Sequence, residues 1–255
     1  MDSTPDHPPP PDDPWAGLRA FTAARIALGR TGTSVPVREA LAFRLAHAHA
    51  RDAVYSELET ARLLTELGAL ALPVLAVRSQ VENRPQYLQR PDLGRVLHED
   101  SRTTLLENAP APADLVLILA DGLSATAINE HALPLLRLLV PRLQQAGFRL
   151  APIVVAEQAR VAISDEIGAA LRARLALILI GERPGLSAPD SLGAYFTYAP
   201  RPGLTDEARN CVSNIRPAGL PYAAAAEKLF FLLSEAFRRH LSGVQLKDDT
   251  SRLGQ

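Results

Sequence analysis

The sequence predicts an α/β fold, in which a mostly parallel sheet flanked by helices follows a small helical N-terminal subdomain. Two short apolar runs, 115–120 and 175–180, have the unbroken pattern of strands buried on both faces of a parallel sheet. In the second half of the chain such runs alternate with segments of helical apolar spacing, which favours parallel strands joined by crossovers. Before residue 73 the spacing is helical.

Composition limits the possible functions of the chain. With 255 residues, 47% apolar and 22% charged, it has the make-up of one large globular domain or two modest ones. Its net charge of −1 gives no basis for binding nucleic acid or an anionic membrane surface. No apolar stretch approaches the roughly 20 residues that span a bilayer, and no secretory signal is present. The single cysteine, Cys211, rules out an intrachain disulfide and suggests a reducing compartment, so we expect a cytoplasmic protein.

The first hundred residues divide into a leader and a mainly helical part. Residues 1–14 hold six prolines and four aspartates and predict a disordered leader. Helical patterns follow at 14–28, after Pro36 and at 54–70, and the second presents Val37, Leu41 and Leu45 on one face. A short strand is expected at 74–77, followed by turns and polar connectors. We therefore expect a helical subdomain over 15–100, an α/β domain over 101–243 and a polar tail over 244–255.

The second half predicts alternating elements. After the strand at 115–120, a helix is expected over 125–147, with Ser124 as its N-cap and Gly147 just past its end. Pro134 and Pro141 are expected to kink or split that helix. The later expectations are a strand at 149–155, a helix at 161–172, strands at 174–180 and 194–198, a helical turn after Thr205 and a helix at 221–241. This order is built like a Rossmann domain, so we expect a Rossmann-like sheet.

The loop after the strand at 174–180 is the first candidate for a site. Gly181 ends the apolar run, Glu182 and Arg183 follow at once, and Pro184 prevents regular structure from continuing. In an open α/β sheet, ligands bind beyond the carboxyl ends of the strands. Glu182 is therefore either a ligand contact or half of a surface ion pair with Arg183, and the loop alone leaves both open.

Other possible sites are incomplete. The glycine-rich segment 29–34 lacks the Gly-Lys-Ser/Thr ending of a phosphate loop, and no Gly-x-Gly-x-x-Gly follows a strand. The turn at 121–124 is able to bind an anion or to cap the next helix, and Ser124 lacks the second glycine of a hydrolase elbow. The histidines form no metal-binding pattern, and Cys211 is expected to be a small buried hydrophobe. The residues thus predict no catalytic and no metal-ligating group, which points to a binding module or a non-catalytic subunit.

Six motifs occur along the chain in a characteristic order. They are Ala24-Arg25-Ile26-Ala27-Leu28-Gly29-Arg30-Thr31-Gly32, Arg78-Ser79-Gln80-Val81, Tyr87-Leu88-Gln89-Arg90-Pro91-Asp92-Leu93-Gly94-Arg95, Asp121-Gly122-Leu123-Ser124, Gly181-Glu182-Arg183-Pro184-Gly185-Leu186 and Cys211-Val212-Ser213-Asn214-Ile215. Taken together, they resemble a known family, the small (light) subunit of ethanolamine ammonia-lyase, and the resemblance covers residues 16–243.

The resemblance implies a subunit of an adenosylcobalamin-dependent lyase that converts ethanolamine to acetaldehyde and ammonia by a radical mechanism. A large partner subunit would hold ethanolamine and the catalytic groups, and cobalamin would lie between the two subunits. The family's cofactor contacts match Val161, Glu182 and Cys211 here, with Arg183 as a residue that could hold Glu182 in place. Some members enter a bacterial microcompartment through an amphipathic leader, which prolines interrupt in residues 1–14. The alternatives are a Rossmann-like module for a nucleotide or another corrinoid, and a structural interaction subunit without cofactor contact.

Overall fold

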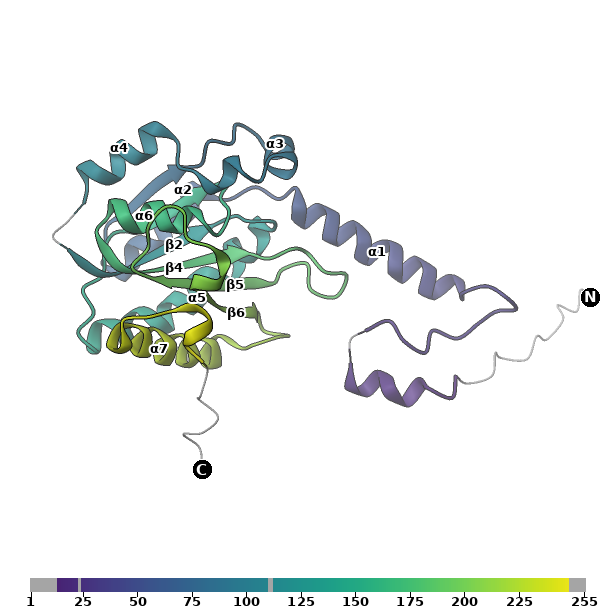
Figure 1. Ribbon diagram of the computed structural model, residues 1–255. Coiled ribbons are helices and arrows are strands. Elements are labelled where there is room, and N and C mark those ends of the chain that lie inside the picture. The colour runs from purple at the N-terminus through teal and green to yellow at the C-terminus, as the bar shows by residue number, and fades with distance from the viewer. Residues whose placement is uncertain (1–12, 23, 110–111, 248–255) are drawn as a thin grey trace, which may run out of the picture.

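The computed structural model describes residues 13–22, 24–109 and 112–247, and within them the α/β class predicted from the sequence is confirmed. A six-stranded sheet with the order β1-β3-β2-β4-β5-β6 lies between two layers of helices (Figure 1). The expected leader falls almost wholly outside the described residues. The strands are β1 (Val74–Arg78), β2 (Ala113–Ala120), β3 (Ile153–Glu157), β4 (Ala173–Gly181), β5 (Leu192–Tyr198) and β6 (Arg209–Ile215).

The sheet is parallel over β1, β3, β2 and β4 and antiparallel over β5 and β6. Strand β6 was not predicted, because its sequence is mostly polar. As the edge strand it buries only Arg209, Val212 and Ile215, so it lacks the apolar run of a central strand. Strand β3 also begins later than expected, at Ile153.

Strand β2 lies at the centre of the core, and all its residues are buried. Leu115, Leu117 and Leu119 face a cluster that includes residues of α2 (Thr60–Leu67), α5 (Ala125–Gln145) and α7 (Tyr222–Arg239). The alternate residues Val116 and Ile118 face α4 (Glu99–Glu107) and α6 (Ile163–Ala170). This alternation follows from the two-residue period of a strand and explains why β2 has no polar face.

Helix α5 is continuous through Pro134 and Pro141, so the two prolines do not split it. Eleven of its residues are buried, and this packing offsets the hydrogen bonds that proline cannot make. Gly147 follows the helix with a φ of 84°, as expected for the residue after a C-cap. Ser124 stands at the N-cap position, but its hydroxyl donates to the Pro189 carbonyl oxygen at 2.9 Å, so the expected side-chain cap is wrong.

The N-terminal region contains the expected helix after Pro36, α1 (Val37–Val54). The helix expected at 14–28 is wrong, because only a 3-10 turn, Ala16–Phe21, forms there and none of its residues is buried. Helix α2 begins at Thr60, not at 54, because α1 extends through Val54 and the chain turns after it. Two helices were missed, α3 (Arg84–Gln89) and α4; Asn83 caps α3 by accepting a hydrogen bond from the Gln86 backbone N–H at 3.0 Å.

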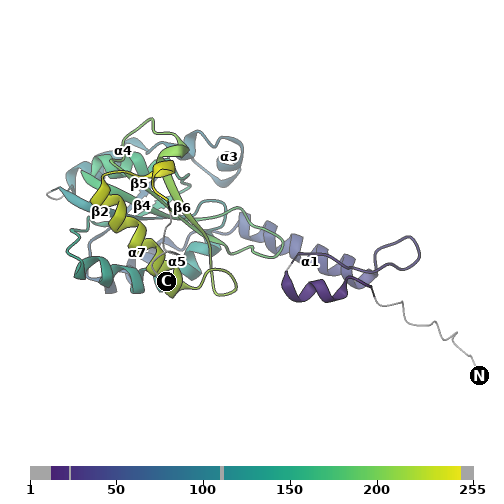
Figure 2. The same ribbon diagram turned by 60° about the horizontal axis from the view of Figure 1, so that its bottom comes forward.

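Helix α1 stands away from the rest of the fold in both views (Figures 1 and 2). At the other end of the chain, Leu246 is buried, and the Asn210 amide donates to the carbonyl oxygens of Gly243 and Leu246 at 3.1 and 2.9 Å. The expected domain boundaries stay predictions. Among the described residues, none of the helices has the length and apolar character needed to cross a membrane.

Candidate functional site

The candidate site lies where the connections after β2 and β4 leave the sheet in opposite directions. From β2 the chain proceeds to β3 on one side, and from β4 it proceeds to β5 on the other. Such a switch point is where open α/β sheets bind ligands. The two loops touch, since the Leu123 N–H donates to the Gly181 carbonyl oxygen at 2.9 Å. Gly122 has a φ of +56°, and a Cβ there would overlap the Gly181 carbonyl, so this approach requires glycine.

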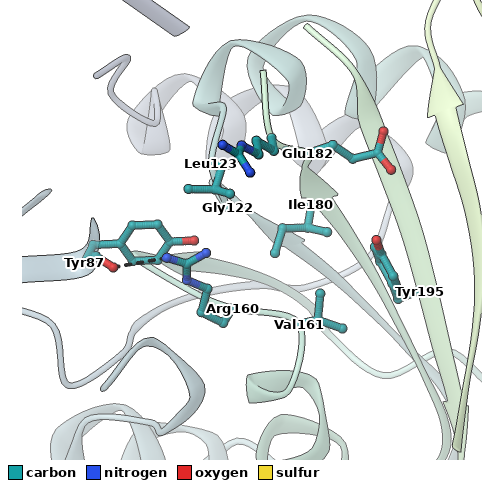
Figure 3. Close-up of a pocket in the computed structure, with 10 residues that line it drawn as sticks. Tyr87, Gly122, Leu123, Arg160, Val161, Ile180, Glu182 and Tyr195 are labelled. Atoms are coloured by element: carbon teal, nitrogen blue, oxygen red, sulfur yellow. Dashed lines mark hydrogen bonds between the residues drawn. The ribbon is translucent and has the colours of Figure 1, made fainter. Parts of the chain in front are cut away.

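A groove opens at this switch point (Figure 3). It consists of one cavity of about 390 Å³ and an adjoining one of about 360 Å³, which share Arg160, Val161 and Tyr195. We call it the switch-point groove. Its first cavity is lined by Tyr87, Gly122, Leu123, Arg160, Val161, Ile180, Gly181, Glu182, Arg183 and Tyr195, and the second adds Pro91, Arg95, Ala162, Asp206, Arg209 and Cys211.

The structure brings together the three residues singled out in the sequence. Val161 lines both cavities from the segment before α6, Glu182 lines the first from the end of β4, and Cys211 lines the second from β6. Cys211 is exposed, so the expectation of a buried hydrophobe is wrong; it lies on an edge strand whose outward face is uncovered. The cofactor role of these residues stays a prediction.

Glu182 is half-buried and held on one side of its carboxylate. Ser191 donates its hydroxyl hydrogen to Oε2, and the Asn214 backbone N–H donates to the same oxygen at 3.2 Å. The described residues make no hydrogen bond to Oε1 and no ion pair between Glu182 and Arg183, so Ser191 and Asn214 hold Glu182, not the arginine. Gly193 makes room for this side chain, because a Cβ there would lie 2.9 Å from Glu182 Oε1.

Arg160 and Tyr87 form the opposite wall of the groove and were not singled out individually in the sequence. The Arg160 guanidinium carbon lies 4.1 Å from the centre of the Tyr87 ring, and Nη2 donates to the Tyr87 carbonyl oxygen at 3.1 Å (Figure 3). Arg160 Nε is buried without a hydrogen-bond partner among the described residues. A buried donor without a partner is costly, so the Nε of Arg160 retains an unused capacity to donate a hydrogen bond. The position of Arg160 directly before Val161 was the available sequence signal.

A buried carboxylate supports the floor of the groove. Asp121 accepts backbone N–H groups from Gly122, Gln158 and Ala159, each at 3.0 Å, and thereby ties the end of β2 to the segment after β3. Burial raises the pKa of Asp121 to about 6, against the opposing effects of these N–H groups and of Arg84. Arg84 lies 3.4 Å from Asp121 Oδ2.

Tyr195 and Cys211 are cross-strand partners on β5 and β6. Although Cys211 is an exposed residue, the surrounding protein partly desolvates its thiol and raises the thiol pKa; the Tyr195 hydroxyl lowers this pKa, and the negative charge of Glu182 raises it further. Burial and the neighbouring thiol also raise the pKa of Tyr195. The groove thus holds a protonated thiol and a protonated phenol beside a carboxylate, a set suited to hydrogen bonding and not to nucleophilic attack.

The loop between β4 and β5 is fastened from outside the groove by His131. Its Nδ1 lies 2.8 Å from the Tyr222 hydroxyl, and its Nε2 lies 3.1 Å from Asp190 Oδ2. Both contacts are satisfied when Nε2–H donates to Asp190 and the Tyr222 O–H donates to Nδ1. Asp190 directly precedes Ser191, so this contact fixes the loop that carries the partner of Glu182.

The same histidine belongs to a group of potential metal ligands within the described residues. Ligand atoms of Glu130, His131 and Asp190 all lie within 4.8 Å of one another. Arg216 Nη1 lies 3.6 Å from Asp190 Oδ1, and its positive charge opposes a cation there. That the chain binds no metal stays a prediction.

Comparison with known proteins identifies a consistent set of relatives. A family profile described as ethanolamine ammonia-lyase light chain (EutC) matches residues 12–247. The chain is 56% identical to an ethanolamine ammonia-lyase small subunit of Azotobacter vinelandii, over 96% of this chain and 92% of the relative. A protein of that name from Pseudomonas putida is 54% identical, over 94% of this chain and 90% of the relative. One from Ralstonia nicotianae is also 54% identical, over 92% of this chain and 88% of the relative.

Proposed function

The chain belongs to the ethanolamine ammonia-lyase light-chain (EutC) family, and from this we propose that it covers adenosylcobalamin at an interface with a large catalytic subunit. As the small subunit of a heteromeric lyase, it takes part in the conversion of ethanolamine to acetaldehyde and ammonia. One observation supports the cofactor role most. Val161, Glu182 and Cys211, which come from three separate segments, converge on the switch-point groove.

The groups in the groove fit the chemistry of cobalamin. A corrin carries amide side chains, and its nucleotide tail adds a ribose and a phosphate. The buried Nε of Arg160 has no protein acceptor among the described residues and suits a carbonyl or phosphate oxygen. Glu182 Oε1 suits an amide N–H or a ribose hydroxyl. Leu123, Val161 and Ile180 supply an apolar floor for the macrocycle.

The size of the groove supports a site shared between two subunits. Its two cavities, of about 390 and 360 Å³, are each of the size that suits a drug-sized molecule, and cobalamin is larger than both together. This chain therefore touches only one part of the cofactor, and a second protein surface has to cover the rest. That requirement agrees with a small subunit that works beside a large one.

The cofactor supplies a cobalt–carbon bond whose homolysis generates the radical that starts the reaction. The residues of this chain bind and orient. Glu182 accepts a hydrogen bond at Oε1 while Ser191 and Asn214 fix Oε2, and Arg160 donates from the opposite wall. The floor of the groove excludes water. The large subunit holds ethanolamine, and the complex works in the cytoplasm, in some bacteria inside a microcompartment.

The test uses the complex made by co-expression with the cognate large subunit. Adenosylcobalamin is titrated into the purified complex in the dark, and affinity and ethanolamine deamination are measured for the parent, Glu182→Gln and Glu107→Gln. Glu107 is an exposed carboxylate at the end of α4, outside the groove, and serves as the control. We expect weaker binding only for Glu182→Gln.

Other outcomes would identify the alternatives. Equal cobalamin affinity for both variants in an active complex would mean that the chain is a structural subunit without cofactor contact. Binding of a nucleotide or another corrinoid in competition with adenosylcobalamin, without deamination, would favour a different binding module. An inactive complex of correct stoichiometry would contradict the lyase function.

A further inference from the structure

The N-terminal arm, residues 13–54, is the largest feature that the groove does not explain. It comprises the 3-10 turn Ala16–Phe21 and helix α1, and it projects from the fold in both views (Figures 1 and 2). Ala53 is the only buried residue of α1, an 18-residue helix. An isolated helix of this length is marginally stable in water, and most helices in proteins depend on packing. The arm has the form of an element that packs against another chain.

The arm also carries most of the large apolar side chains that are exposed among the described residues. Eight of the thirteen lie in it, and a ninth, Tyr55, directly follows its last residue. The eight are Trp15, Leu18, Phe21, Val35, Val37, Leu41, Phe43 and Leu45. Val37, Leu41 and Leu45, exposed by 74%, 57% and 59%, lie four residues apart and form a stripe along α1. A concentration of this kind marks an interaction surface.

The root of the arm is attached to the rim of the switch-point groove. The Arg84 guanidinium donates from Nε to the Val54 carbonyl oxygen at 2.7 Å and from Nη1 to the Gly122 carbonyl oxygen at 2.9 Å. Just beyond the root, Ser56 accepts the Thr126 backbone N–H at 3.1 Å, at the start of α5. The arm therefore leaves the fold at the edge where β2 ends. A protein that covers the groove meets the arm as a continuation of the same surface.

Charge argues against a second copy of the arm as the occupant. Residues 13–54 contain six arginines and three acidic residues, a net charge of +3 in a chain whose total is −1. Two such arms would repel each other when their stripes are paired. The complementary surface is an apolar groove with an acidic rim on a different protein.

We propose that the N-terminal arm docks into an apolar, acid-rimmed groove of the large subunit and carries a major part of the affinity between the subunits. The proposal rests on the heteromeric assembly in the proposed function, but not on cofactor binding. The arm would order against the large subunit and hold it over the switch-point groove.

The test compares two substitutions of equal character. Leu41→Glu and Leu106→Glu each place a charge at an exposed leucine, since the two residues are 57% and 58% exposed. Leu106 lies on α4, away from the arm (Figure 1). The full chain is co-expressed with the large subunit, and the dissociation of the complex is measured by analytical ultracentrifugation. Circular dichroism and thermal melts check the fold of each variant alone.

We expect Leu41→Glu to weaken assembly by about tenfold or more, which corresponds to about 1.4 kcal/mol, because the variant loses the burial of a leucine side chain and would bury a charge in its place. Leu106→Glu is expected to leave assembly unchanged. Equal affinities for the parent and Leu41→Glu would overturn the proposal. It would equally be overturned if the chain alone formed a dimer that Leu41→Glu dissociates, because the occupant would then be a second copy.

The variant Glu182→Gln distinguishes a failure of the docking proposal from a failure of the proposed cofactor role. That variant is expected to assemble like the parent while it binds cobalamin more weakly. If its cobalamin affinity is unchanged, the cofactor role fails while the result for Leu41→Glu still decides the role of the arm.

Discussion

His131 Nε2 lies 3.1 Å from Asp190 Oδ2, and through this contact helix α5 holds the loop that positions the Glu182 carboxylate. His131 is buried and Asp190 is half-buried, so the contact is largely shielded from solvent. The contact joins helix α5 to the loop between β4 and β5 and fixes the conformation of that loop.

His131→Ala is expected to lower the free energy of unfolding by about 1–3 kcal/mol, because it removes one hydrogen-bond partner from Asp190 and one from Tyr222. In the complex it is also expected to weaken adenosylcobalamin binding, since Ser191 would lose its fixed position. Urea unfolding and cofactor titration measure the two effects. Tyr222→Phe keeps the contact with Asp190 and should weaken cofactor binding less; the reverse order would contradict this account.

Glu182→Gln is expected to weaken cofactor binding by roughly ten- to a hundredfold, because a hydrogen bond to a charged group is worth about 1.5–3 kcal/mol. The stability of the free chain should change little, since the amide oxygen of Gln can still accept from Ser191 and the Asn214 N–H. Titration of the complex and thermal melting of the free chain measure these quantities separately. A large loss of stability would instead make Glu182 a structural residue.

Gly193→Ala tests the position of Glu182 without a change of charge. The added Cβ would lie 2.9 Å from Glu182 Oε1 and 3.0 Å from Cγ, so the carboxylate has to move. We expect weaker cofactor binding, as for Glu182→Gln, with maximal deamination recovered at saturating cofactor. Gly68→Ala, at a site with open space around it and an ordinary φ of −55°, controls for the loss of glycine flexibility. Binding equal to that of the parent would show that Glu182 is not held as tightly as the structure indicates.

Alkylation of Cys211 reports the electrostatics of the groove through its pH dependence. Partial desolvation of the thiol and the charge of Glu182 raise the thiol pKa, so the thiolate fraction at neutral pH is small and alkylation by iodoacetamide accelerates as pH rises. Glu182→Gln removes the negative charge, lowers the pKa and speeds the reaction at pH 8. Tyr195→Phe removes the hydroxyl that stabilises the thiolate, raises the pKa and slows it. Shifts of the same sign in both variants would refute the assigned causes.

The ion pair between Asp165 and Arg209 borders the second cavity, which Arg209 lines. Two contacts of 2.8 Å join the groups, and each side chain is 3% exposed. Asp165→Ala is expected to lower the free energy of unfolding by about 3–5 kcal/mol, because it removes the buried partner of a buried cation and leaves only the exposed Asp206, 3.4 Å away. Glu235→Ala, which breaks an exposed pair with Arg238, should have a negligible effect in the same urea experiment. Replacement of both Asp165 and Arg209 by apolar residues should cost less than Asp165→Ala alone.

The sequence predicted the elements that have a strong period and a buried environment. Strand β2 reads as an unbroken apolar run because both of its faces are covered, and α7 reads as a helix because one face packs on the sheet. The short helix α3 was missed because it has six residues and one buried side chain, too few for a periodic signal. The 3-10 turn at Ala16–Phe21 has no buried residue, so the apolar spacing of this segment did not correspond to packing within the described chain.

The site was predictable only in part. Glu182 stands at the end of an apolar run, so its place at the carboxyl edge of the sheet follows from the sequence. Its partners do not follow, because Ser191 and Asn214 belong to a later loop and an edge strand that only the fold brings together. Arg160 carries no signal beyond its neighbour Val161, since the absence of an acceptor at its Nε is a property of the packed structure.

A single guanidinium connects the two surfaces assigned to the partner and to the cofactor. Arg84 donates to Val54 at the root of the arm and to Gly122 at the rim of the groove. We expect this shared side chain to couple the two binding events, and any such coupling is reciprocal. The factor by which docking of the arm tightens cofactor binding must then equal the factor by which the cofactor tightens the subunits, so the small subunit would release both together.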